Sequence, residues 1–169
     1  IYAKYTGLSE MYKNAEEIIE ASDVVNRRQR QILMSYIRSN PQVAGYGLTS
    51  LSDAQGLGEG VMDNFRDWKT GYGEMLTEAW APLRWCILFN NDNSNVKKGE
   101  KATFEVDIAN DDILPAGEYS AVFTINNAAG ETVYTSENVS FTVEAGETTP
   151  FSYKVWKGEV DITFPAGEY

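Results

Sequence analysis

The sequence predicts an α+β protein with a helical first half and an antiparallel β second half. Apolar residues recur with a helical period from Ser9 to Asn40, whereas apolar and polar residues alternate after Ala81-Pro82. A glycine-rich stretch from Gly45 to Lys69 separates these two patterns. We therefore predict two domains, residues 1–80 and residues 81–169.

Two helices are expected before the glycine-rich stretch. Ser9 can cap a helix that runs to about Glu20, and Ser22 or Asp23 can start a second one that ends before Pro41. The apolar inner side of the second helix consists of Val25, Ile32, Leu33, Tyr36 and Ile37. Three arginines lie on the same helix, and we interpret them as a solvated face rather than an anion site: Arg27, Arg28 and Arg30.

The glycine-rich stretch is the part of the chain that links the two patterns. Residues 43–48 have the character of a short buried strand, residues 49–60 form a polar loop, and a third helix is expected from Asp67 to Trp80. One strand among three helices cannot form a sheet, because its backbone groups have no partner. This lone strand is the first indication that the chain belongs to a larger protein.

The second half predicts a series of short strands, each with one apolar face. They cover residues 84–89, 103–108, 119–125, 139–143 and 151–155, with turn signals between them. Strands at this spacing are typical of an antiparallel two-sheet sandwich of immunoglobulin type.

One internal repeat stands out within this half. Pro115-Ala116-Gly117-Glu118-Tyr119 recurs as 165–169, and the first copy continues into an expected strand. The second copy stops at its tyrosine. We therefore expect the sandwich to be truncated at its last strand.

Composition excludes several classes of function. A net charge of −11 disfavours nucleic acid and anionic membrane surfaces as partners. The chain has no histidine, which removes Ser-His-Asp and Cys-His nucleophiles and His-ligated zinc. Cys86 is the single cysteine and lies in an apolar run, so we expect a buried free thiol. No apolar run reaches the ~20 residues that span a bilayer, and the residues indicate no metal site and no cofactor.

The glycine-rich stretch also carries a family resemblance. The run from Gly45 to Asp53, then Gly60-Val61-Met62-Asp63, then Arg66 and Lys69, resembles the end of the catalytic barrel in glycoside hydrolase family 2. Ala81-Pro82-Leu83 is similar to the passage of that family into an immunoglobulin-like domain. The resemblance implies a helical remnant of a (β/α)8 barrel followed by an immunoglobulin-like sandwich. The chain would then be an excised C-terminal part of such an enzyme.

The sequence departs from the family pattern at three places. Thr49 stands where the family usually has a Trp that lines the sugar site. Trp68, directly before Lys69, stands where the family has a Pro. Nothing in the chain resembles the surroundings of the two catalytic glutamates. The resemblance therefore implies a fragment that is inactive by itself, from a retaining β-glycosidase that works with two carboxylates. Its partners would be the rest of the barrel and, through the intact enzyme, carbohydrate, in the periplasm or outside the cell.

No catalytic residue is predicted in the chain, and the candidate substrate-binding residues lie on the loop: Thr49, Ser52, Asp53 and Gln55. Asp53 can bond a sugar at the rim of the site or cap backbone amides of its own loop. We expect Arg66 and Lys69 to serve structure rather than substrate. Asp53 and Glu59 share the loop, but nothing in the sequence fixes their separation.

Two other functions remain open at this point. The chain can be a non-catalytic module that binds carbohydrate or protein through its β-sandwich, or a small self-contained hydrolase. The lone strand discriminates the fragment from the module, because only in a fragment would its edges and the inner helix faces stay uncovered.

Overall fold

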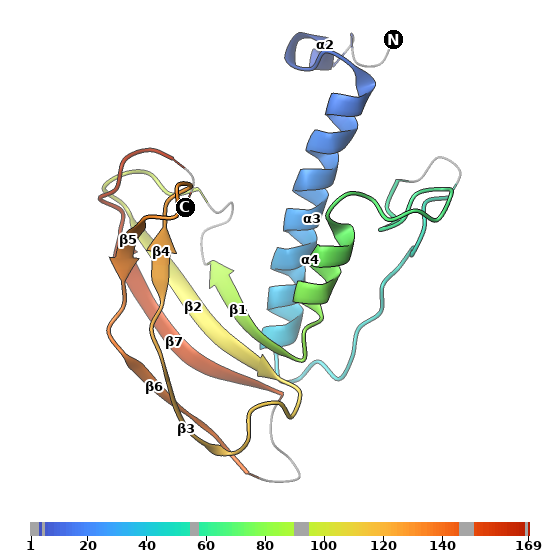
Figure 1. Ribbon diagram of the computed structural model, residues 1–169. Coiled ribbons are helices and arrows are strands. Elements are labelled where there is room, and N and C mark those ends of the chain that lie inside the picture. Colours follow the sequence, from blue (N-terminus) through green and yellow to red (C-terminus); the bar gives the residue numbers. More distant parts are fainter. Residues whose placement is uncertain (1–3, 5, 55–57, 90–94, 146–150, 168) are drawn as a thin grey trace. The chain divides into compact units, whose positions relative to one another are not determined.

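The computed structural model describes residues 4, 6–54, 58–89, 95–145, 151–167 and 169, and it has an α+β fold (Figure 1). The helices are α2 (Leu8–Met11), α3 (Ala15–Ser39) and α4 (Tyr72–Ala79). The strands are β1 (Leu83–Phe89), β2 (Lys101–Asn110), β3 (Gly117–Ala121), β4 (Thr124–Asn126), β5 (Thr132–Thr135), β6 (Val139–Val143) and β7 (Ser152–Asp161). Contacts divide the chain into two compact units: residues 1–34 with 46–80, and residues 35–45 with 81–169.

One long helix replaces the two that the sequence predicted between Ser9 and Asn40. The carboxamide of Asn14 accepts the amide of Glu17 at 2.9 Å, and the Glu17 carboxylate accepts the amide of Lys13 at 2.8 Å. These bonds cap the start of α3. Neither glycine nor proline follows before Pro41, so Ser22 and Asp23 lie inside the helix instead of starting a new one.

The expected buried strand at residues 43–48 is wrong. This segment forms no strand, and its residues are half-buried or exposed. The amide of Val43 donates to the carbonyl of Asn40, which makes a turn at the point where the strand should begin. Its apolar character alone cannot create a strand, because no neighbouring strand in the described chain pairs with it.

The third helix begins at Tyr72 and not at Asp67. The carboxylate of Asp63 accepts the amides of Phe65 at 2.8 Å and Asp67 at 3.0 Å, which ties residues 63–67 into a turn. Gly71 then takes a positive φ of 75° immediately before α4.

The core of the first unit is small and lies between α4 and the loop before it. Its buried members are Val61, Tyr72, Met75, Leu76 and Ala79, and the partly buried side chains of Met34, Leu48 and Met62 pack against them.

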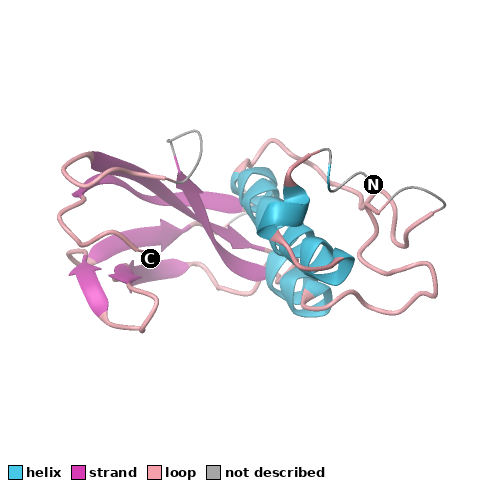
Figure 2. Ribbon diagram, turned by 90° about the horizontal axis from the view of Figure 1, so that it is seen from above, coloured by secondary structure: helices cyan, strands magenta, loops and turns pink. Residues whose placement is uncertain are grey.

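The strands of the described chain all belong to the second unit and are antiparallel (Figure 2). β1, β2 and β7 form one sheet in the order β1-β2-β7, while β3 pairs with β6 and β4 pairs with β5. The expected strands at 84–89, 103–108 and 139–143 are confirmed, and the one at 119–125 is split into β3 and β4. β5 was not predicted. The structure thus has three small sheets in place of the two of a sandwich.

The two-stranded sheets are consecutive parts of one interrupted hairpin. Gly117 is opposite Val143 in β3–β6, and Thr124 is opposite Thr135 in β4–β5. We call residues 117–143 the long hairpin. Along its first arm, residues 117–126 alternate between half-buried and exposed positions, as expected for a strand with one covered face.

Aromatic rings connect the long hairpin to the three-stranded sheet. The ring centroids of Trp85 and Phe123 are 5.4 Å apart in an edge-on arrangement, and those of Phe123 and Trp156 are 5.9 Å apart in a stacked one. Trp85 also meets Phe141 at 5.9 Å. Such pairs stabilise beyond their buried area, so these rings help to hold the long hairpin against the three-stranded sheet.

The last turn of α3 belongs to the second unit and is held there by polar contacts. The Arg38 guanidinium lies 3.0 Å from the carboxylate of Asp111, and the Ser152 hydroxyl donates to the carbonyl of Ser39 at 2.6 Å. The side chain of Arg84 donates to the hydroxyl of Ser35 at 2.9 Å.

β2 and β7 shift register between Val106 and Asp107, so that β7 carries one extra residue, Val155. Next to the shift, Asp107 is buried, and one of its carboxylate oxygens has no hydrogen-bond partner among the described residues. Burial, and to a lesser degree the nearby Glu105 carboxylate, raises the pKa of Asp107 from 3.8 to about 6, against the opposing effect of Lys154.

As predicted, Cys86 is a buried free thiol, and burial raises its pKa.

The raised pKa of Asp107 predicts a pH-dependent stability. The folded chain binds the proton of the Asp107 carboxyl more tightly than the unfolded chain does. The protonated carboxyl therefore contributes fully to the free energy of unfolding below pH 4, and this contribution is lost as the pH rises through about 6. Asp107→Asn should therefore be more stable than the wild type at pH 7, by about 1–3 kcal/mol, with no gain at pH 4. Urea unfolding at both pH values measures this. Asp161→Asn, at an exposed position of β7, is the control, and equal gains at both pH values would contradict the assignment.

Candidate functional site

The loop that carries the predicted site residues, residues 49–71, is built around an ion pair, and we call it the central loop. The Lys69 ammonium lies 3.0 Å from the Asp53 carboxylate, and both side chains are only 13% exposed. The same carboxylate oxygen accepts the amide of Gly60 at 2.8 Å, and Lys69 also donates to the carbonyl of Gly58 at 3.0 Å. Asp53 and Lys69 thus connect the beginning and the end of the central loop to each other and to its middle, at Gly58 and Gly60.

Gly60 lets two segments of the central loop lie against each other. A Cβ atom at this position would lie 2.4 Å from the amide nitrogen of Asp53 and 2.4 Å from the carbonyl carbon of Ser52. Beside it, Met62 forms bridges with Ser52 and Trp68. A side chain at residue 60 would therefore push the Asp53 backbone away from the position in which it meets Lys69.

Tyr72 connects the central loop to α3. Its hydroxyl is 3.2 Å from a carboxylate oxygen of Asp23 and 3.1 Å from the side-chain oxygen of Asn26. Burial and the neighbouring Asp23 raise the pKa of Tyr72 to about 12. The guanidinium of Arg27 and the ammonium of Lys69 lie 5.7 Å and 5.8 Å from the centre of its ring, within the range of cation–π attraction.

Two arginines of α3 complete this network, so their interpretation as a solvated face is wrong. Arg27 donates to the carbonyl of Thr70, and Arg30 donates to the carbonyl of Glu59. Arg30 also bonds the side chain of Asn26 at 2.7 Å. We call the side of α3 formed by Asp23, Asn26, Arg27 and Arg30 the polar face.

The predicted substrate-binding residues are only partly brought together. Thr49 is exposed, Ser52 is half-buried beside Met62, and Asp53 is occupied by Lys69 and Gly60. Gln55 lies outside the described residues. Of the two readings of Asp53, the contacts match the one in which it caps its own loop.

The contacts of Asp53 and Lys69 tie the central loop together and do not bring two carboxylates face to face. A retaining glycosidase needs two carboxylates about 5–5.5 Å apart, whereas the Asp53 carboxylate contacts a cation, Lys69, and the amide of Gly60. Glu59, the other acid of the loop, contributes its backbone carbonyl to Arg30. The described residues also hold no cluster of acids or cysteines suited to a metal ion.

Comparisons with known proteins identify no related protein. No model of a protein family matches the sequence, and searches of curated proteins and of solved structures find no match. Among the helices described, none combines the length and apolar character needed to cross a bilayer.

Sequence reasoning missed the polar face of α3 and the role of Tyr72. A signal was present, because residues 23, 26, 27 and 30 follow the three- and four-residue spacing of one helix side. The spacing was not recognised as a packing face because only apolar residues were expected to form one.

The contacts of Gly60 predict a sharp effect of one methyl group. Gly60→Ala should lower the free energy of unfolding by about 1–3 kcal/mol, because the clash is with backbone atoms. Gly73→Ala, in α4 with open space around it, should raise stability by up to ~1 kcal/mol. Urea unfolding followed by circular dichroism compares the two, and equal effects would disprove the close approach.

The ion pair predicts non-additive mutations. Lys69→Met leaves the Asp53 charge buried and should cost about 2–4 kcal/mol, somewhat below the value for a fully buried pair. Adding Asp53→Asn should recover part of this loss. Lys101→Met breaks an exposed pair with Glu159, which water screens, and should change the free energy of unfolding little. Simple additivity at Asp53 and Lys69 in a double-mutant cycle would show that the pair does not organise the loop.

Proposed function

We propose that the chain is a non-catalytic C-terminal part of a glycoside hydrolase similar to family 2. It contributes the last helices of a barrel and an immunoglobulin-like domain to an enzyme that cleaves β-linked glycosides by the retaining two-carboxylate route. By itself the chain is inactive, and it requires no cofactor. The remainder of the barrel is its partner, and carbohydrate is bound only by the assembled enzyme, in the periplasm or outside the cell.

The observation that carries this proposal is the inverted use of α3. Its polar face is turned toward the central loop and Tyr72, while apolar residues elsewhere on the helix surface stay uncovered. Val25 and Leu33 are 55% and 58% exposed, and Ile32 is exposed beside them. We call Val25, Ile32 and Leu33 the apolar stripe. A helix ordinarily buries such a stripe, so its exposure supports a missing protein partner.

A second observation supports the choice of family. Several of the residues that carry the resemblance contact one another within the central loop. Asp53 and Lys69 pair directly, Gly60 sits against the Asp53 backbone, and Val61 is fully buried. Asp63 closes the turn that leads to α4. The motif therefore has one structural purpose, which is to fix the loop that would border the sugar site.

The segment at residues 43–48 fits the same proposal. It forms no strand with any described residue, and it runs directly into the central loop. A neighbouring barrel strand would supply the hydrogen bonds that it lacks. In this proposal Thr49 and Ser52 face the substrate, and Asp53 holds the loop that presents them.

The proposal predicts both inactivity and a protein contact. The chain alone should not release nitrophenol from aryl β-glycosides. Co-production with the polypeptide encoded directly upstream of Ile1 should give a stable complex with turnover, because that polypeptide supplies the two glutamates and covers the apolar stripe. Val25→Lys with Leu33→Lys should abolish complex formation. Glu20→Lys, which changes the net charge equally at an exposed position of α3, should not.

Two results would refute the proposal. One is an upstream sequence without a barrel containing two suitable glutamates. The other is turnover by the chain alone that disappears in Asp53→Asn, which would favour a self-contained hydrolase.

A further inference from the structure

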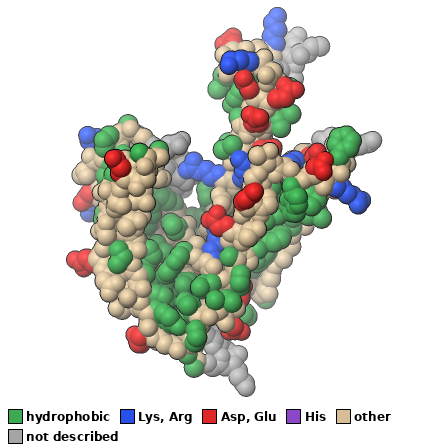
Figure 3. Space-filling model, viewed as in Figure 1, with side chains coloured by type: hydrophobic (Ala, Val, Ile, Leu, Met, Phe, Trp, Pro, Cys, Tyr) green, Lys and Arg blue, Asp and Glu red, His purple; other side chains and the backbone are tan. Residues whose placement is uncertain are grey.

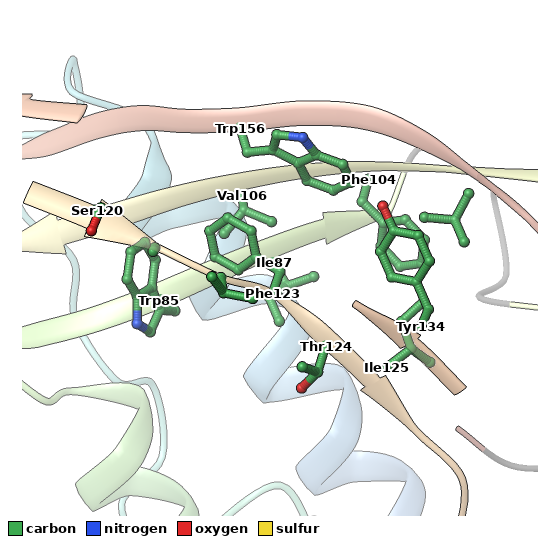
Figure 4. A pocket seen from close by; sticks show the side chains of 13 residues that line it. Trp85, Ile87, Phe104, Val106, Ser120, Phe123, Thr124, Ile125, Tyr134 and Trp156 are labelled. Carbon is green, nitrogen blue, oxygen red and sulfur yellow. The ribbon is translucent and has the colours of Figure 1, made fainter. Parts of the chain in front are cut away.

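The second unit contains an uncovered apolar groove that the proposed glycosidase function does not use. A cavity of about 430 Å³ opens between the long hairpin and the three-stranded sheet. Every residue that lines it is uncharged, and Figure 4 shows the ring of Phe123 directed into it near Trp85, Val106 and Ile87. In Figure 3 hydrophobic side chains are visible at the surface of the molecule, and Ile87 is 57% exposed.

One wall of the groove is an unpaired strand edge. β3 and β4 bond only to β6 and β5 among the described strands, so their other edge has free backbone donors and acceptors. The run from Tyr119 to Ile125 contains neither a charge nor a proline. Natural edges are usually protected by one of these, and an unprotected edge is a template for pairing.

The order of the strands shows which edge of the long hairpin stays open. β6 lies alongside β7, and the sheet order β1-β2-β7 therefore leaves the place below β1 and beside β3–β4 open.

We propose that this groove binds one extended strand of another polypeptide, which adds to the β3–β4 edge. Its inward side chains, at alternate positions, are apolar, because the groove offers no charged partner. Its outward side chains are neutral or basic, since the chain carries a net charge of −11. This is recognition by strand addition, in which backbone bonds give affinity and alternate side chains give specificity.

A synthetic peptide tests the proposal directly. The probe is acetylated and amidated KTVTFTITK, with valine, phenylalanine and isoleucine at alternate positions. Two controls have the same composition or the same side chains: KVFITTTTK breaks the alternation, and a backbone N-methylated probe lacks the donors. Binding is followed by the fluorescence of Trp85 and Trp156, which line the groove, and by hydrogen exchange.

We expect the probe to bind and to protect the amides of residues 119–125. Both control peptides should bind at least about tenfold more weakly, a difference of about 1.4 kcal/mol. Ile87→Lys places a charge in the groove and should weaken binding to the same degree. Ile113→Lys should leave it unchanged, because Ile113 is similarly exposed at 51% and does not line the groove.

Several outcomes would overturn the proposal. Absence of binding at about 1 mM probe, equal binding of KVFITTTTK, or protection of β1 in place of residues 119–125 each rules out addition at this edge. A wild-type dimer in light scattering that Ile87→Lys dissociates would show that a second copy occupies the groove. None of these outcomes bears on the proposed glycosidase function, which rests on α3 and the central loop.

Discussion

The ion pair between Asp53 and Lys69 is the constraint on which the first unit depends. It connects the beginning and the end of the central loop, and its geometry is possible only because Gly60 lets the backbone pass closely. The same pair places Lys69 beside the ring of Tyr72, the largest fully buried side chain of the core. An ion pair this poorly hydrated needs supporting hydrogen bonds, and the amide of Gly60 and the carbonyl of Gly58 supply them.

Helix α3 shows that amphipathic character does not by itself say which side of a helix packs. The polar face makes directed hydrogen bonds with the central loop and Tyr72, and Met34 of the same helix packs against the core of the first unit. The apolar stripe stays available for a surface that would bury it. Polar contacts thus hold the helix in place, and its exposed apolar residues can associate with another protein surface.

The sequence identified the strands of the second unit far better than the elements of the first. Alternation of apolar and polar residues is a local property, so β1, β2 and β6 could be predicted from it. The contact between Asp53 and Lys69 spans sixteen residues, and no local pattern indicates it. The strand predicted at residues 43–48 failed because an apolar run describes a preference, whereas a strand also needs a neighbour.

The extra residue in β7 explains one further limit and has a consequence for folding. Tyr153 is paired with Ile108 and Trp156 with Val106, so an odd-numbered and an even-numbered residue of the same strand share one face of the sheet. Simple alternation through Val155 could not have anticipated this. A strand with such a break has one correct alignment, because sliding it by one or two positions misplaces the aromatic side chains on one side of the break. The β-bulge thus disfavours misaligned pairing of β7 with β2 while the sheet forms.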